Sequence, residues 1–183
     1  METYTLNVCG LTRKLRKTPV TDELSIASFV MFGDTELVEK CADALAEKIK
    51  ALGKIDYLVS PEAKGIPLTH AIAVRLNIDY VVIRKSVKAY MTNPLITDVQ
   101  SITTAKKQQL VMDEPDVRKL DGKRVCIVDD VVSTGGSLKS VETLLSQINC
   151  TVAAKVAVLL EEAGYDGKDL IYLERLPIFK TSK

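Results

Sequence analysis

The sequence predicts an α/β fold with a twisted, mostly parallel sheet flanked by helices. Short apolar runs alternate with segments of helical period, which is the pattern of repeated strand–helix–strand units. Some of the runs are continuously apolar, as expected for strands that are buried on both faces of a sheet. The chain has 183 residues, of which 46% are hydrophobic and 27% charged. These values are typical of one globular domain, so we expect residues 1–183 to form a single domain.

Each element has a local signal. Apolar residues spaced by three and four predict the first helix, which Asp34 or Thr35 can cap and Gly53 can end. Short apolar runs bounded by polar or glycine residues predict the strands. The predicted elements are, in order, helix Thr35–Leu52, strand Asp56–Ser60, loop Ser60–Gly65, helix Pro67–Leu76, strand Asp79–Arg84, strand Arg124–Val128, helix Gly136–Ile148, strand Val152–Leu160 and strand Leu170–Leu173.

One long segment, Ser86–Gln109, interrupts this alternation. It contains Pro94 and has no helical period, so it is either a lid, a flexible hairpin or a wrongly assigned stretch. Basic residues dominate the segment and its approach, with Asp98 as the only acid: they are Arg84, Lys85, Lys88, Lys106 and Lys107. A basic flap favours an anionic ligand, and a solvated loop is the alternative.

Composition excludes several classes of protein. Lys and Arg number 25 against 24 Asp and Glu, a net charge of +1, which predicts no general attraction to nucleic acid or to membranes. No apolar run is long enough for a membrane span and no signal peptide is evident, so we expect a cytoplasmic protein. The four cysteines form no C-x-x-C pair and His70 is the only histidine, which argues against a zinc site and a Ser-His-Asp hydrolase.

The strongest functional signal is RVCIVDDVVSTGGS at Arg124–Ser137. Here an apolar strand leads through two acids and a Ser-Thr-Gly-Gly turn into a helix. Glycines let backbone N–H groups approach a phosphate, and the helix N-terminus favours negative charge. Ser133, Thr134 and Ser137 add hydroxyl donors. The turn therefore predicts a monophosphate site at the carboxyl end of a strand.

The adjacent acids, Asp129 and Asp130, suit a different part of the ligand. Carboxylates accept hydrogen bonds from a sugar diol. The glycine turn and the two acids together therefore predict a ribose 5-phosphate site. A Walker A loop and a dinucleotide-binding G-x-G-x-x-G are both absent. A receiver-like acidic pocket would not need the glycine turn, and an ordinary capped helix would not need both acids and glycines.

VDDVVSTGG resembles the phosphoribosyl pyrophosphate (PRPP) signature of type I phosphoribosyltransferases. SPEAKGIPL, at Ser60–Leu68, resembles the pyrophosphate loop of the adenine and xanthine enzymes, which often contains a non-proline cis peptide. The resemblance assigns the 5′-phosphate to Val132, Ser133, Thr134, Gly135, Gly136 and Ser137. It assigns the pyrophosphate to Glu62, Ala63, Lys64, Gly65, Arg84 and Lys85.

Two further segments extend the resemblance to about residues 24–176. IASFVMFGDTELV resembles the hood over the base, and SITTAKKQQLVM resembles the flexible loop that closes over PRPP. The resemblance thus implies the type I phosphoribosyltransferase fold, with a small hood over about residues 1–35 and a flexible loop over about residues 86–109. The base would contact Phe29, Met31 and Val131. In the flexible loop, Thr104-Ala105-Lys106 replaces the Glu-Tyr-Gly of adenine enzymes.

The implied reaction joins a purine, with adenine as first expectation, to the ribose of PRPP and releases pyrophosphate. Asp129, Asp130 and Lys88 are the expected catalytic residues, and the two aspartates are the expected ligands of Mg²⁺. The resemblance also implies a homodimer. Three alternatives remain open: a PRPP-sensing regulator without catalysis, a xanthine or hypoxanthine phosphoribosyltransferase, and an orotate phosphoribosyltransferase.

Overall fold

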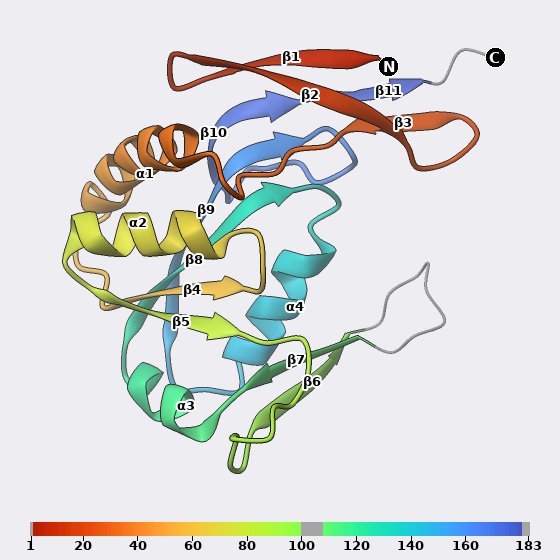
Figure 1. Ribbon diagram of the computed structural model, residues 1–183. Helices are drawn as coiled ribbons and strands as arrows, with labels where there is room; N and C mark the ends of the chain where they lie inside the picture. Colours follow the sequence, from red (N-terminus) through yellow and green to blue (C-terminus); the bar gives the residue numbers. More distant parts are fainter. Residues whose placement is uncertain (1, 100–107, 181–183) are drawn as a thin grey trace.

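The computed structural model describes residues 2–99 and 108–180, and it confirms the predicted α/β architecture. Its central sheet has five parallel strands in the order β10-β9-β8-β4-β5 (Figure 1). The strands are β4 (Tyr57–Pro61), β5 (Asp79–Ile83), β8 (Arg124–Val132), β9 (Thr151–Glu161) and β10 (Ile171–Leu176). The strand order reverses beside β4 and β8, because β4 lies between β5 and β8 while β9 and β10 continue on the other side. Ligands of open α/β sheets bind where the order reverses.

Helices cover both faces of this sheet. They are α1 (Thr35–Lys50), α2 (Ile66–Leu76), α3 (Glu114–Leu120) and α4 (Gly136–Leu145). Alternating residues of β8 explain the two layers: Cys126 and Val128 pack with α1 and α2, whereas Val125 and Ile127 pack with α4. This alternation is the period of two that every strand has. The continuous apolar run of β8 is therefore a strand buried on both faces, as predicted.

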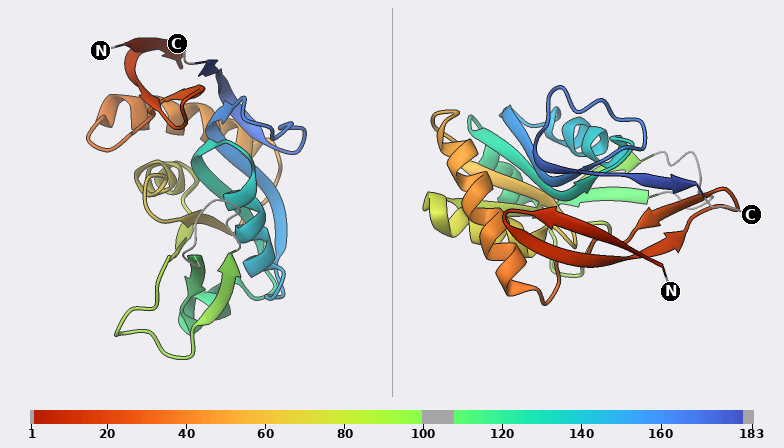
Figure 2. Two further views of the ribbon diagram at one scale, coloured as in Figure 1. Left: turned by 90° about the vertical axis from the view of Figure 1, so that its right-hand side faces the viewer. Right: turned by 90° about the horizontal axis from the view of Figure 1, so that it is seen from above.

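The hood is an antiparallel sheet in the order β1-β2-β3-β11. Its strands are β1 (Thr3–Val8), β2 (Leu11–Pro19), β3 (Leu24–Ala27) and β11 (Ile178–Lys180). The C-terminal strand thus returns to pair with the N-terminal segment, and both lie above the parallel sheet (Figure 2). None of these strands was among the predicted elements. Cys9 and Gly10, both at positive φ, form the tight turn between β1 and β2.

The segment that interrupts the alternation contains a hairpin, one of the three structures considered for it. Strands β6 (Leu95–Val99) and β7 (Gln108–Met112) pair antiparallel, and a bridge between Arg84 and Val111 joins β7 to the end of β5. Residues 100–107 of the expected flexible loop lie outside the described residues. Helix α3, which follows β7, was not predicted; Asp113 caps it by accepting a hydrogen bond from its first N–H.

Several boundaries differ from the predictions, and the end of β8 affects the site. Strand β8 continues to Val132 instead of ending at Val128, so both aspartates lie inside the strand. Strand β10 runs to Leu176, and helix α4 ends at Leu145. None of the helices in the described ranges is long and apolar enough to cross a membrane.

Candidate functional site

The predicted phosphate-binding segments meet at one edge of the parallel sheet. Strands β4, β5 and β8 are neighbours and parallel, so the loops that follow them emerge on the same side. These loops are residues 61–65, 84–86 and 132–137. The first of them lies against strand β8: a Cβ added to Gly65 would lie 3.4 Å from Asp129 Cα and 2.9 Å from Ser60 Oγ. The sheet topology therefore brings two of the sequence motifs into direct contact.

The turn between β8 and α4, residues Val132–Ser137, has the geometry of a phosphate cradle. Gly135 is the N-cap of α4 at φ 80°, and no side chain caps the helix. The first N–H groups of the helix are therefore left for a ligand, at the end where the helix dipole attracts negative charge. A cavity of about 100 Å³ lies on the turn, lined by Asp129 and residues 131–138. Its size and position fit one phosphate group.

The hydroxyl of Ser133 is not available to this cradle in the way the sequence suggested. It donates a hydrogen bond of 2.6 Å to Oε2 of Glu161, a buried residue at the end of β9. Because a hydroxyl has one proton to donate, Ser133 offers a phosphate its backbone N–H, and the remaining hydroxyl donors of the turn are Thr134 and Ser137. Sequence reasoning missed Glu161, since nothing in its apolar strand indicates a contact with the cradle.

The two aspartates serve two different cavities. Successive residues of a strand point to opposite faces, and β8 continues through both of them. Asp129 lines the cradle, whereas Asp130 lines a larger cavity below the hood. Asp129 is therefore the aspartate at the cradle, although Asp130 is nearer to the glycine turn in the sequence. Asp130 is only 5% exposed, and its Oδ2 has no hydrogen-bond partner among the described residues.

Asp129 is held in an environment that disfavours its charge. Burial, followed by the nearby charge of Asp130, raises the pKa of Asp129 to about 8. The backbone N–H of Asp130 donates to Asp129 Oδ1 at 2.9 Å and opposes this rise only in part. Two carboxyl groups this close and this buried do not both ionise readily. A ligand that brings positive charge or hydroxyl donors to the pair would relieve both effects.

The loop after β4 carries the predicted cis peptide bond, between Glu62 and Ala63. It leads through Lys64 and Gly65 into α2. Gly65 leaves no space for a side chain, as its contacts with Ser60 and Asp129 show. The loop backbone therefore passes directly beside the acidic pair, and Lys64 reaches the wall of the larger cavity.

The side chain of Glu62 faces its own protein rather than an anion. Its Oε2 lies 2.8 Å from Arg84 Nε, and its Oε1 accepts a 2.6 Å hydrogen bond from the backbone N–H of Lys85. A carboxylate would repel pyrophosphate, so its role is to hold Arg84 and Lys85 next to the loop. The structure thus brings these two cations to the loop after β4, as predicted, and corrects the role of Glu62 itself.

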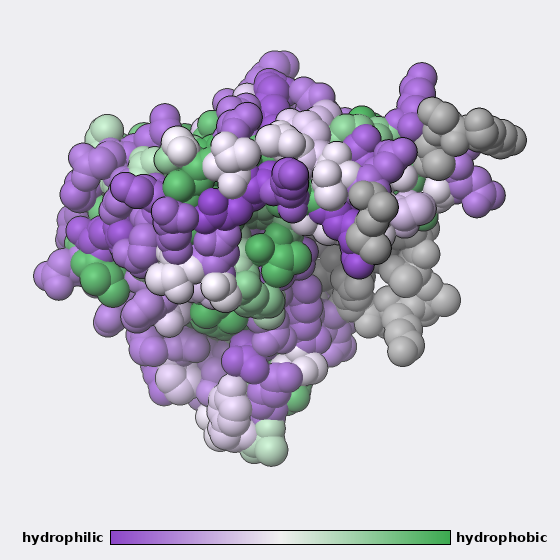
Figure 3. Space-filling model, turned by 45° about the horizontal axis from the view of Figure 1, so that its top comes forward, coloured by the Kyte–Doolittle hydropathy of each residue, from purple (hydrophilic) through white to green (hydrophobic). Residues whose placement is uncertain are grey.

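A cavity of about 350 Å³ lies between the hood and the end of the sheet, within the range of small-molecule sites. Phe29 and Val131, two of the three predicted base contacts, line it together with Lys64, Asp130 and Glu161. On the face drawn in Figure 3, hydrophobic residues also gather near the middle of a mostly hydrophilic surface. The cavity combines apolar walls with a few buried polar groups, which suits a flat heterocycle.

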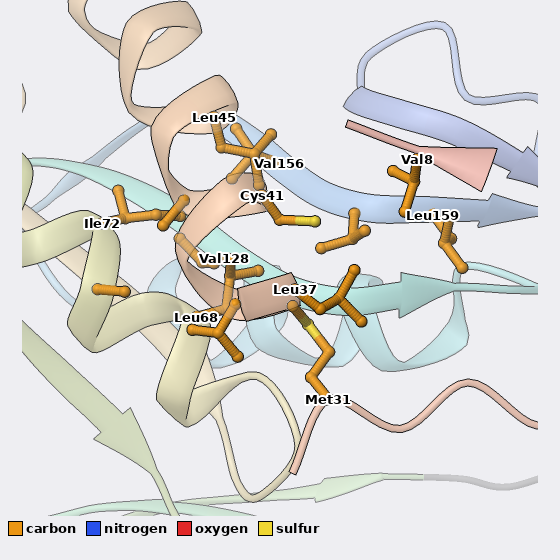
Figure 4. Packing of buried hydrophobic residues seen from close by; sticks show 14 of the residues in the cluster. Val8, Met31, Leu37, Cys41, Leu45, Leu68, Ile72, Val128, Val156 and Leu159 are labelled. Carbon is orange, nitrogen blue, oxygen red and sulfur yellow. The ribbon is translucent and has the colours of Figure 1, made fainter. Parts of the chain in front are cut away.

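Met31, the third predicted base contact, lies elsewhere. It is completely buried, and Figure 4 shows it beside Leu37 among the side chains of the hydrophobic core. The prediction is wrong because core packing, rather than the cavity, takes this side chain. Lys88 is also separate from the site: its ammonium donates to Ser86 Oγ at 2.6 Å, and no described contact joins it to the acidic pair. Lys106 and Lys107 lie outside the described residues.

The acidic pair fits a magnesium ion only if a substrate completes the coordination. In the described part of the chain, no group of three or more His, Cys, Asp or Glu residues could hold a metal. Mg²⁺ commonly uses one or two carboxylates and takes its other ligands from phosphates and water. The unpartnered Oδ2 of Asp130 and the charge-disfavouring surroundings of Asp129 are compatible with that arrangement.

Comparison with known proteins agrees with this geometry. A family model described as the phosphoribosyl transferase domain matches residues 32–178. The chain is 33% identical over 143 residues to HGPRTase-like protein 1 of Haloquadratum walsbyi, covering 74% of this chain and 72% of that protein. It is 31% identical over 137 residues to the adenine phosphoribosyltransferase of Clostridium botulinum, covering 74% and 75%.

Among solved structures, the crystal structure of adenine phosphoribosyltransferase from Thermoanaerobacter pseudethanolicus has the same fold. Its TM-score is 0.72 at 24% identity, over 88% of this chain and 95% of that chain. The family model, the relatives and the shared fold agree with the motifs at the sheet edge, and the chain therefore belongs to the type I phosphoribosyltransferases, in their purine branch.

Proposed function

We propose that this protein transfers the 5-phosphoribosyl group of PRPP to a purine base, giving a nucleoside 5′-monophosphate and pyrophosphate. One observation carries the proposal: a neutral phosphate cradle, an acidic pair and a cationic loop share one sheet edge, beside a cavity for a heterocycle. These parts correspond to the 5′-phosphate, the ribose hydroxyls, the pyrophosphate and the base.

The proposed reaction exchanges one bond at ribose C1. The bond from C1 to the pyrophosphate oxygen breaks and its electron pair leaves with pyrophosphate, while a purine ring nitrogen bonds to C1. The carboxylates of Asp129 and Asp130 would accept hydrogen bonds from the ribose hydroxyls and stabilise positive charge that develops on the sugar. Lys64, Arg84 and Lys85 would neutralise the leaving group. The proton of the base passes to Asp130, which lines the cavity for the heterocycle.

Magnesium, held by Asp129 and Asp130, would supply additional charge neutralisation at the pyrophosphate when it is bound with PRPP. The family's usual requirement for a divalent ion is the basis of this part. Lys88 remains a predicted catalytic residue whose described contacts are to Ser86 and Met91.

Adenine is the base that we propose first. The sequence motifs resemble those of adenine enzymes, and the cavity offers the carboxylate of Glu161 as an acceptor for an amino group. Hypoxanthine and guanine are the next candidates, since the relatives carry both kinds of name. Xanthine and orotate complete the set to be tested.

A PRPP-sensing protein without catalysis is the second candidate. It is favoured by a single observation, the replacement of the flexible-loop glutamate of adenine enzymes by Thr104-Ala105-Lys106. Such a protein would keep the cradle and the cationic loop, and it would bind PRPP without turning over any base.

Calorimetry of PRPP with Mg²⁺, followed by a pyrophosphate-release assay over adenine, hypoxanthine, guanine, xanthine, orotate and uracil, separates the two candidates. We expect binding and turnover with one purine, and loss of turnover when Asp129→Asn and Asp130→Asn are combined. Asp22→Asn with Glu23→Gln, two exposed acids of the hood, is the matched control. Binding without turnover on any base would favour the sensor, and absence of PRPP binding would contradict both.

We also propose the homodimer that the family resemblance implies. Light scattering coupled to gel filtration measures the mass directly. A mass of twice 20.1 kDa would support the dimer, and the mass of one chain would contradict it.

A further inference from the structure

The phosphate cradle is supported from behind by the connection between β9 and β10, residues 162–170 (Figure 1). Tyr165 in this connection lies against Gly135: a Cβ at that glycine would be 2.6 Å from Tyr165 Cδ2 and 3.2 Å from two more ring carbons. The same connection starts directly after Glu161, which binds the Ser133 hydroxyl. Two residues of the cradle therefore contact the end of β9 and the connection that follows it, neither of which is part of the PRPP motif.

A chain of polar contacts fixes the tyrosine ring in this position. The Tyr165 hydroxyl donates to Asp169, and Asp169 also binds the ammonium of Lys155. Lys155, only 9% exposed on β9, bonds in turn to Glu142 of α4 at 2.7 Å. Since α4 begins at the cradle, these contacts form a closed loop from the cradle through Tyr165 and back to its own helix.

The ionisation states of these groups keep the contacts intact at neutral pH. Burial, and then the hydrogen bond to Asp169, raises the pKa of Tyr165 to about 12, so its hydroxyl retains the proton that it donates. Burial lowers the pKa of Lys155, but the hydrogen bonds to Asp169 and Glu142 outweigh it, so this pKa is raised overall. Lys155 therefore stays charged between its two carboxylates.

The ring depends on these contacts, because it is not packed on every side. A cavity of about 350 Å³ lies beside it, bordered by Gly135, Lys139 and Asp169 among others. A tyrosine next to open space can rotate away unless its hydroxyl is held. A turn with two adjacent glycines is the most conformationally free part of a chain, so the cradle needs a support of this kind to keep its N–H groups aligned.

We propose that Tyr165, held by Asp169 and Lys155, is a positioning residue that keeps the cradle in its phosphate-binding conformation. This inference rests on the proposed function, because it assumes that the cradle binds the 5′-phosphate of PRPP. Tyr165 touches the turn from outside the cavity and is not a ligand of the phosphate. Its removal would therefore raise the cost of ordering the turn when phosphate binds.

The test is calorimetric binding of ribose 5-phosphate and, separately, of pyrophosphate to the full-length protein. Tyr165→Ala removes the ring, and we expect it to weaken ribose 5-phosphate binding about tenfold. Tyr165→Phe removes only the hydroxyl, and Lys155→Met removes the ammonium that binds Asp169. We expect each of these variants to bind ribose 5-phosphate about threefold more weakly. Pyrophosphate affinity should not change in any variant, because the cationic loop lies at the ends of β4 and β5.

Tyr172→Ala is the matched control. Tyr172 packs in the same hydrophobic cluster, beside Gly167 of the same connection. We expect this variant to lose thermal stability while retaining ribose 5-phosphate affinity. If Tyr165→Ala does not fold, Tyr165→Phe and Lys155→Met decide the question.

The outcomes separate this inference from the proposed function. Wild-type protein that binds no ribose 5-phosphate would contradict the proposed function itself. Wild-type binding with equal binding by the Tyr165 and Lys155 variants would overturn only the positioning role. Equal weakening of ribose 5-phosphate and pyrophosphate would also overturn it, since that result indicates a general loss of structure.

Discussion

The two regions that we propose to bind phosphate groups are built in different ways. The cradle at Val132–Ser137 offers backbone N–H groups, hydroxyls and a helix N-terminus, and none of the described side chains that line its cavity is cationic. The opposite region offers charged side chains, Lys64, Arg84 and Lys85, with Glu62 holding the last two in place. One region is organised by backbone conformation and the other by charge.

This difference explains why the two regions tolerate different substitutions. A backbone site depends on dihedral angles and close packing, so a single methyl group can disable it. A site made of charged side chains depends on ion pairs that salt weakens. The acidic pair lies between the two regions, and Asp129 contacts both, through the cradle and through Gly65.

The largest effect is expected where the two regions meet. Asp129→Asn combined with Asp130→Asn removes the groups that face the ribose, and we expect turnover to fall at least about 1,000-fold, or about 4 kcal/mol in transition-state stabilisation. Steady-state kinetics of pyrophosphate release measures this loss. Turnover within about tenfold of the wild type would show that the pair is not part of the catalytic site.

The next largest effect tests the backbone region. Gly135→Ala places a methyl group 2.6 Å from the Tyr165 ring at a φ of 80°, so we expect ribose 5-phosphate to bind about 100-fold more weakly. Gly122→Ala is the control, because Gly122 has a similar φ of 71° with nothing within 4 Å of an added Cβ. It should lose about 1 kcal/mol of stability and no affinity. Equal affinities for the two variants would contradict the cradle geometry.

The pKa of Asp129 predicts a pH-dependent stability for the metal-free protein. The folded protein keeps this proton up to a pH of about 8, whereas the unfolded chain releases it near ~3.9. The free energy of unfolding therefore falls as pH rises between these values. Asp129→Asn removes this pH-dependent loss of stability, so we expect the variant to be more stable than the wild type at pH 8, with the gain vanishing toward pH 4. Urea unfolding across this range measures the difference.

Asp56 provides a comparison in which the pKa shift, and therefore the effect of pH on stability, has the opposite sign. A hydrogen bond from the Arg124 backbone N–H, and then one from Lys54, lowers the pKa of Asp56. The contribution of Asp56 to the free energy of unfolding is therefore present at neutral pH and lost in acid. Asp56→Asn should accordingly destabilise the protein most at neutral pH. If both substitutions changed stability in the same direction at pH 8, the assigned environment of Asp129 would be wrong.

The smallest effect tests the charged region. Arg84→Met removes the cation that Glu62 holds, and we expect pyrophosphate affinity to fall about tenfold with ribose 5-phosphate affinity unchanged. Arg75→Met is the control: Arg75 also pairs with carboxylates, those of Glu39 and Asp43, on helix α1. Loss of pyrophosphate binding in the control, or of ribose 5-phosphate binding in Arg84→Met, would break the division into two regions.

The sequence predicted the parts of this molecule whose determinants are close together in the chain. The period of α1, the apolar run of β8 and the glycine turn each lie within one short segment, and the topology then follows from rules for parallel sheets. The cis peptide was implied by the resemblance of one loop, whereas the close approach of Gly65 to Asp129 was not predicted. The parts that needed distant contacts were missed: β11 pairs with β3 across most of the chain, and Glu161 reaches Ser133 from another strand.

Two errors have local physical reasons. Met31 lies in a hood segment that resembles a base-binding one, but its flexible apolar side chain fills the core beside Leu37. The apolar run predicts that β8 ends at Val128, but the strand continues through both acids to Val132. Alternation along the extended strand assigns each aspartate to its own cavity.

The salt dependence of binding tests the central distinction most directly. Ribose 5-phosphate and pyrophosphate are titrated into the wild-type protein at low and at high salt, without magnesium. We predict that pyrophosphate affinity falls steeply with salt, because it is bound by exposed cations, while ribose 5-phosphate affinity changes much less. Parallel losses for the two ligands would contradict the account of one region built by backbone and the other by charge.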